Sequence, residues 1–177
     1  MWTENILDLL LRPLSDEGIT DLLTYLHINK SKIKLKEYRS STVVDNEKMG
    51  VILKFTSFFE IMDGLVKPDI TISPELSEKL KNISALPEST LFLITINITN
   101  ENIDNSGFSL PHNLDFNMTK TDVINMFGVP VKENPKIGSM QWFFDTHRLV
   151  IRFENNSLTI TSLEVSMLNN THLRLGL

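Results

Sequence analysis

The chain contains no cysteine among its 177 residues. Disulfide bridges, thiolate zinc sites and cysteine nucleophiles are therefore excluded, and a reducing compartment is favoured. No apolar run approaches the roughly 20 residues that a membrane-spanning helix needs. The N-terminal stretch "MWTENILDLLLRPL" lacks a basic start and a small-residue cleavage site, so it does not resemble a signal peptide. These features predict a cytoplasmic protein that does not bind membranes.

Sequence signals of catalysis are also scarce. The seven glycines are scattered singly, so no phosphate-binding loop is present, and there is no Gly-x-Ser-x-Gly elbow. Asp145 and His147 lie two residues apart, where strand alternation puts both on one face and lets them merely pair. None of the histidines stands at a metal-ligand spacing from another ligand type. The four histidines are His27, His112, His147 and His172. We expect no enzyme activity, no metal and no cofactor.

The composition is that of an ordinary globular protein, with 41% apolar and 22% charged residues. A chain of this length can bury one core, either as one domain or as two small halves that share it.

A helix is predicted within "NMTKTDVINMFGVPVKENPK", residues 117 to 136. Thr119 stands at the N-cap with Asp122 three residues later, close to a capping box, and Gly128 followed by Pro130 ends the helix. We expect Gly128 to adopt a left-handed turn. The predicted apolar face consists of Val123, Ile124, Met126 and Phe127.

A fainter version of the same pattern occurs in "PLSDEGITDLLTYLHINKSK", residues 13 to 32. Ser15 is the expected N-cap, and Asp16 and Glu17 favour the positive end of the helix dipole. The apolar residues Ile19, Leu22, Leu23 and Leu26 recur at helical spacing. A further N-terminal helix, "TENILDLLL", presents the apolar stripe Ile6, Leu9 and Leu10.

Runs typical of β-strands follow each of these two helices. After the second come "SMQWFFDTH", "RLVIRFENN" and "SLTITSLEVSM", which predict an antiparallel meander. After the first come "KEYRSSTVVDN", "MGVILKFTS" and, much later, "TLFLITINITN". Aligning Ser15 with Thr119 brings "VILKF" (51 to 55) near "LVIRF" (149 to 153).

The sequence therefore predicts an α+β protein made of two tandem helix-plus-meander halves in one body. The halves are 1–99 and 107–177, joined by the polar linker 100–107, and the first half carries an insert at about 58–88 between its second and third strands. Internal duplication explains the two halves, and so does chance, because a helix followed by a meander is common in α+β proteins.

Charge is distributed unevenly. The insert holds six acidic residues and three lysines, and so supplies three of the five net negative charges. Its segment "FTSFFEIMDGLVKPDI" suits a basic partner, with Phe58, Phe59 and Met62 as anchors. Alternatively, these apolar residues belong to the core. The basic run "KSKIKLK" (30 to 36) indicates an edge strand with four lysines on one side, which guards against aggregation. We expect no direct binding of nucleic acid.

A family resemblance is carried by "FSLPHNLDFNMTKTDVINMFGVPVKEN", by the Trp142 strand and by "LVIRFENNSLTITSLEVSM". Together with "LLRPLSDEGITDLLTYL" and "MGVILKF", these resemble bacterial immunity proteins of polymorphic-toxin and contact-dependent growth-inhibition systems. Within that pattern, turns are marked by Leu110-Pro111 and Gly128-Val129-Pro130, which are structural residues and not a functional signature. The helix-turn-meander unit is also similar to the β-lactamase inhibitor protein and to small envelope lipoproteins of the outer-membrane assembly machinery. Those proteins are exported, and this chain lacks the lipobox cysteine.

The immunity resemblance implies a protein that binds one cognate toxin domain and blocks its active or substrate-binding site. Such toxins are most often nucleases with basic clefts, and an RNase is the first expectation. The expected contact residues of the insert are Phe58, Phe59, Glu60, Asp63 and Asp69.

The expected alternative surface is an open sheet face that bears Trp142 and Phe144, with Phe143 on the opposite side. Two further functions remain open, namely an envelope scaffolding or inhibitor module and a small-ligand binding domain.

Overall fold

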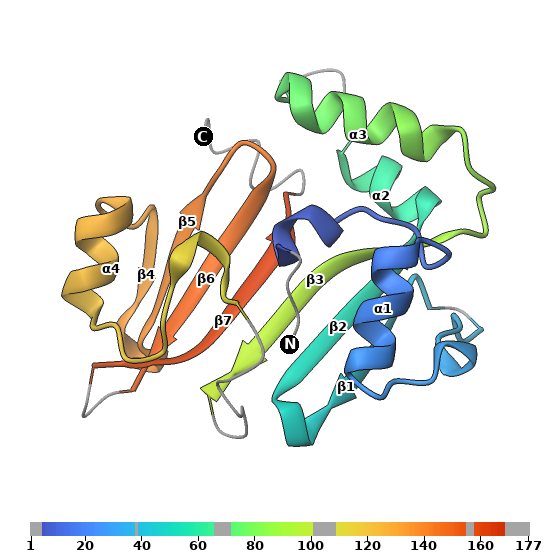
Figure 1. Ribbon diagram of the computed structural model, residues 1–177. Helices are drawn as coiled ribbons and strands as arrows, with labels where there is room; N and C mark the ends of the chain where they lie inside the picture. Colours follow the sequence, from blue (N-terminus) through green and yellow to red (C-terminus); the bar gives the residue numbers. More distant parts are fainter. Residues whose placement is uncertain (1–4, 38, 66–71, 101–108, 155–157, 169–177) are drawn as a thin grey trace.

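The protein is an α+β fold built on one open antiparallel sheet, seen in a computed structural model (Figure 1). Residues 5–37, 39–65, 72–100, 109–154 and 158–168 are described, with the side chains of 62–65 left out. Within them the α-helices are α1 (Glu17–Tyr25), α2 (Phe58–Leu65), α3 (Pro74–Ser84) and α4 (Lys120–Phe127). The strands are β1 (Ser41–Asn46), β2 (Val51–Ser57), β3 (Leu91–Thr99), β4 (Lys132–Asn134), β5 (Ser139–Phe143), β6 (His147–Phe153) and β7 (Ile160–Met167). Short 3₁₀ helices are η1 (Ile6–Leu9), η2 (Lys30–Lys32), η3 (Glu47–Met49), η5 (Pro111–Asn113) and η6 (Pro135–Ile137).

The sheet has seven strands in the order β1-β2-β3-β7-β6-β5-β4. The two meanders are therefore joined side by side through β3 and β7, which pair antiparallel from Thr95↔Ser166 to Thr99↔Ser162. The six predicted strands of the two meanders are confirmed, and the short edge strand β4 adds one that was expected to be loop. The expected linker, 100–107, lies almost wholly outside the described residues.

The N-terminal segment completes the sheet where β3 and β7 separate. Leu11 N donates to Leu93 O at 2.7 Å, and Leu14 N donates to Leu91 O at 2.7 Å. Residues 11 to 14 thus lie beside the first half of β3, while β7 pairs with its second half. Figure 1 shows η1 and this segment in front of the sheet, between its two wings. Residues 11 to 14 therefore extend the sheet along the part of β3 that β7 leaves unpaired.

Alternating residues of β3 divide the core into two clusters. Leu91 and Leu93 belong to the main cluster, which α1, η1 and α4 cover, whereas Phe92 belongs to a smaller cluster with α2 and α3. Because successive strand residues point to opposite faces, α2 and α3 cover the other face at one end of the sheet. The segment between β2 and β3, where the insert was expected, thus forms two helices packed against that end.

The helix boundaries follow from capping. Thr119 and Asp122 form the expected capping box of α4. The cap of α1 is Asp16 rather than the expected Ser15, because the Asp16 carboxylate accepts from Ile19 N. Met126 was expected on the buried face of α4 but is 43% exposed. Only Val123 of α4 is fully buried, and Ile124 and Phe127 pack partly buried against the same core, at the end of the sheet where Figure 1 shows α4.

Two predictions about local conformation are wrong. The run "KSKIKLK" forms η2 and a coil instead of an edge strand, because the Asn29 side chain caps Ser31 N and starts a helical turn. Gly128 has a positive φ of 78°, as expected, but its ψ of −169° is extended, so the turn is not left-handed helical. The chain can then leave α4 directly toward β4.

No helix in the described part of the chain is long and apolar enough to cross a membrane.

Candidate functional site

The helical insert presents one aromatic side chain to solvent. In α2, Ile61 is 2% exposed and Phe58 packs partly buried beside it in the smaller core cluster. Residues three apart lie on the same face of a helix, so this pair anchors α2 and turns its neighbours outward. Phe59 is 69% exposed, and Glu60 beside it is also exposed. An aromatic ring and a carboxylate are thereby held together on an anchored helix.

The expected contact residues of the insert thus fall into three groups. Phe59 and Glu60 are accessible on α2, whereas Phe58 lies against the core, as the alternative interpretation has it. Asp63 belongs to α2, but its side chain is among those left undescribed. Asp69 lies outside the described residues.

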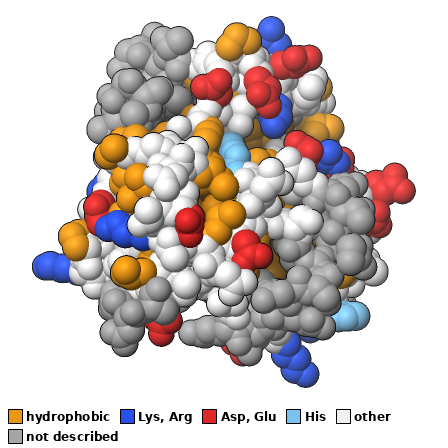
Figure 2. All heavy atoms as spheres, turned by 60° about the vertical axis from the view of Figure 1, so that its left-hand side comes forward, with side chains coloured by type: hydrophobic (Ala, Val, Ile, Leu, Met, Phe, Trp, Pro, Cys, Tyr) orange, Lys and Arg blue, Asp and Glu red, His pale blue; other side chains and the backbone are white. Residues whose placement is uncertain are grey.

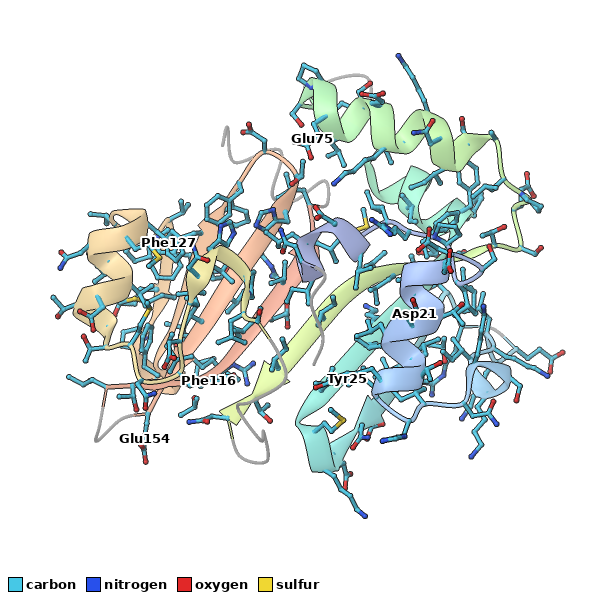
Figure 3. All side chains as sticks on the ribbon, viewed as in Figure 1. Asp21, Tyr25, Glu75, Phe116, Phe127 and Glu154 are labelled. Carbon is cyan, nitrogen blue, oxygen red and sulfur yellow. The ribbon has the colours of Figure 1, made fainter. Side chains whose placement is uncertain are left out.

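The expected open face at Trp142 is a covered face. Trp142 is only 4% exposed, and its indole N–H donates to Gly128 O at 3.1 Å. Phe127 extends from α4 toward the sheet and contacts both Trp142 and Phe144, at centroid distances of 5.7 Å (Figure 3). Trp142 and Phe144 do share one side, as alternation predicts, but α4 packs on that side. Trp142 is therefore a core residue.

Phe144 contributes to a cluster of histidine and aromatic rings. His112 of η5 and His147 at the start of β6 approach with their Nε2 atoms 2.9 Å apart. The Phe144 ring stacks on both imidazoles, at centroid distances of 4.5 Å and 4.7 Å. Figure 2 shows the face that carries α4, where histidine atoms lie among hydrophobic side chains. Sequence reasoning missed this pair, because the partners are 35 residues apart and no local spacing signals them.

Burial sets the protonation of the two histidines. Burial of His147, which is 5% exposed, together with the smaller effects of the nearby His112 and Lys79, lowers its pKa to about 4. Burial also lowers the pKa of His112. Both imidazoles are thus neutral at pH 7, so one Nε2 donates and the other accepts. The Thr146 hydroxyl lies 3.1 Å from Nδ1 of His147 and fixes the orientation of that ring.

The chemistry open to this pair is limited. Among the described residues, no group of three or more His, Cys, Asp or Glu side chains is placed to hold a metal ion. The Nε2 atoms of His112 and His147 already hydrogen-bond to each other, so each has its partner within the pair. The pair therefore ties η5 to the beginning of β6, and it supports the covered face of the sheet.

An apolar rim lies at the end of α4 and in the segment that leads to β4. Met126 is 43% exposed, Val129 84% and Val131 49%. The backbone beneath them is ordered, since Val131 N donates to Gln141 O at 3.0 Å. This rim is a second accessible apolar surface, distant along the chain from α2.

No protein-family model, curated protein or solved structure matches the chain. Function has therefore to be argued from its own surfaces and from the sequence resemblance.

Proposed function

We propose that this protein is an inhibitor of the immunity type, which acts in the cytoplasm by binding a cognate toxin domain. It occludes the active or substrate-binding site of that domain and catalyses no reaction. The observation that carries the proposal is the surface of α2, where Phe59 is 69% exposed next to an exposed Glu60. The resemblance to immunity proteins and the acidic insert support the same function.

The physical case rests on how interfaces gain affinity. Exposed aromatic side chains on anchored elements are typical binding hot spots, since they bury a large area at little conformational cost. Ile61 and Phe58 fix α2, so Phe59 is held in place before binding. Carboxylates around an aromatic anchor steer a basic partner and raise its association rate. A nuclease with a basic cleft, and an RNase first, is the partner that this chemistry favours.

We also infer that the two meanders arose by internal duplication. The loops β1–η3–β2 and β4–η6–β5 have the same form, in which an Asn caps a 3₁₀ turn that ends at a left-handed Gly. Asn46 and Gly50 have φ of −123° and 62°, and Asn134 and Gly138 have −121° and 60°. This correspondence supports matching β2 with β5, instead of the match of "VILKF" with "LVIRF" that helix alignment favours.

The test begins with the gene encoded immediately upstream. Its C-terminal domain is expressed alone and together with this protein, and growth is followed. We expect growth arrest, rescue by coexpression and a complex of nanomolar affinity. A non-toxic neighbour, or a toxin that is neither bound nor rescued, would overturn the immunity assignment.

Two variants then locate the surface. Phe59→Ala should weaken the complex by about 2 kcal/mol, roughly 30-fold, and Glu60→Lys should slow association most at low salt. Val129→Ala is the matched control, because it truncates an equally accessible side chain on the apolar rim. If Val129→Ala weakens the complex and Phe59→Ala does not, the rim is the interface and the insert is not.

A further inference from the structure

The outermost strand at one end of the sheet has a free edge. Among the described residues β1 pairs only with β2, and Figure 1 shows it at the end of the sheet opposite α4. Ser57 N donates to Ser40 O, so residue 40 turns its backbone groups toward β2. By strand alternation Thr42, Val44 and Asn46 do the same, while Ser41, Val43 and Asp45 turn their N–H and C=O groups away from the sheet. No backbone hydrogen bond between described residues closes this edge.

A basic strip precedes β1 in the chain, and its last two cations, Lys36 and Arg39, lie beside the edge. Lys32, Lys34, Lys36 and Arg39 are all exposed. Ile33, which is 4% exposed, and the half-buried Leu35 anchor the strip to the main core. Within the described part of the chain, none of the four cations forms an ion pair. This concentration of unpaired positive charge occurs in a protein whose net charge is −5.

A hollow connects the strip to the strand. Lys36 and Arg39 form one side of a cavity of about 410 Å³, and residues 40 to 43 form the other. Val43, which is 56% exposed, also lines this hollow. Backbone donors, an apolar side chain and two cations therefore border one groove.

We propose that this edge binds an extended acidic segment of a partner protein by strand addition. The segment lies antiparallel or parallel to β1 about 4.8 Å away, and its backbone pairs with the outward groups of Ser41, Val43 and Asp45. Its carboxylates meet Lys36 and Arg39, and an apolar residue covers Val43. The inference goes beyond the proposed function, because the ligand is acidic and the surface is not the insert.

A protein ligand fits this edge better than a nucleic acid does. The outward N–H and C=O groups of β1 have the spacing of the C=O and N–H groups along a second peptide strand. A nucleic acid has no matching row of alternating donors and acceptors. Phosphates would use the cations alone and would leave Val43 and the strand edge unused. Alternatively, the lysines only protect the sheet edge from aggregation. In that case their replacement should lower the solubility of the protein and leave peptide binding unchanged.

The probe is a fluorescein-labelled ten-residue peptide that alternates Glu and Val, titrated with the full chain at 50 and 200 mM salt. Its partner probe has the same sequence with alternate backbone nitrogens methylated, which keeps every charge but removes strand pairing. We expect saturable micromolar binding of the first peptide, at least tenfold weaker binding of the second, and further weakening at high salt.

Three variants complete the design. Lys36→Glu with Arg39→Glu should lower affinity at least tenfold, whereas Lys132→Glu with Lys136→Glu, at the opposite end of the sheet, should leave it within twofold. Val43→Pro removes one outward N–H that the sheet does not use, and should weaken binding at least threefold. Thermal melts confirm that each variant is folded.

Several results would overturn the proposal. The first is the absence of saturable binding of the Glu-Val peptide. The second is equal affinity for the methylated peptide, which would mean that the site attracts charge and forms no strand pairing. Tighter binding of a fluorescein-labelled ten-nucleotide oligouridylate, lost in the Lys36→Glu/Arg39→Glu variant, would assign the strip to nucleic acid instead.

Discussion

Acid should destabilise the protein through His147, and the size of the effect can be worked out from burial. The usual pKa of 6.5 falls to about 4 in the folded protein. In the unfolded chain His147 is exposed and takes up a proton near its usual pKa, whereas the native state does so only at much lower pH. Between these two values the unfolded state binds more protons, so the free energy of unfolding rises with pH. This contribution is complete above pH 6.5 and is lost as pH falls toward 4.

The magnitude follows from the length of that interval. Each pKa unit corresponds to about 1.4 kcal/mol, so the full loss is about 3 kcal/mol. The perturbation is His147→Gln, because the glutamine amide can still reach His112 but does not titrate. The difference in unfolding free energy between wild type and variant should shrink by about 3 kcal/mol from pH 7 to pH 4. Contributions from unrelated carboxylates cancel in this difference.

Urea unfolding followed by tryptophan fluorescence at pH 7, 6, 5 and 4 measures the effect, and Trp142 lies within the ring cluster. His27→Gln, which removes an exposed histidine, is the matched control for loss of an imidazole. The NMR titration of the His147 Hε1 signal should have its midpoint near 4. Parallel stability curves for wild type and His147→Gln, within about 0.5 kcal/mol at every pH, would refute the burial argument.

Four substitutions test the packing by urea or thermal unfolding. Gly50→Ala should cost at least about 2 kcal/mol, because φ is +62° and a Cβ would lie 2.6 Å from Thr99 Oγ1; a smaller loss would mean that β3 can move. Gly128→Val should cost about 1 to 3 kcal/mol from backbone strain alone, because nothing lies within 4 Å of the added Cβ. Thr119→Ala should cost about 1 kcal/mol by removing the cap of α4, and no change would show that α4 contributes little to stability. Trp142→Phe should cost about 1 to 3 kcal/mol because Gly128 O loses its donor, and an unchanged stability would place a water there.

Local sequence patterns, namely caps and hydrophobic periodicity, predicted much of the fold. Thr119 and Asp122 identified α4, and the periodic leucines identified α1, because capping and helical spacing act within a few residues. The apolar runs identified β1 to β3 and β5 to β7, since each strand carries its own alternation. The approximate position of the insert was also visible, because about thirty residues separate the second and third strand-like runs, but the two helices within it were not predicted.

The surroundings of Trp142 and the His112–His147 pair depended on tertiary contacts, which local sequence patterns do not encode. Trp142 has the same alternation whether its face is open or covered, and only the position of α4 decides between them. His112 and His147 meet because Pro111 starts a turn in which His112 takes a φ of 58°, and no spacing rule encodes that turn. The four lysines of "KSKIKLK" looked like a strand because every second residue is basic, yet the Asn29 cap determined the local structure.

The two proposed binding surfaces carry opposite charges, and both lie in the first half of the chain. In these proposals the second half serves as structural support. The acidic insert projects from the end of β2, and the basic strip borders β1, the strand beside it. A partner with a basic cleft and an acidic extended arm could engage both surfaces at once, and the two contacts would then reinforce each other by effective concentration. Phe59→Ala and Lys36→Glu/Arg39→Glu should in that case each weaken the same complex, and because the two surfaces share no contact, the free-energy losses should add in the combined variant. If the affinity of each ligand responds to only one of the two changes, the two surfaces bind independent ligands instead.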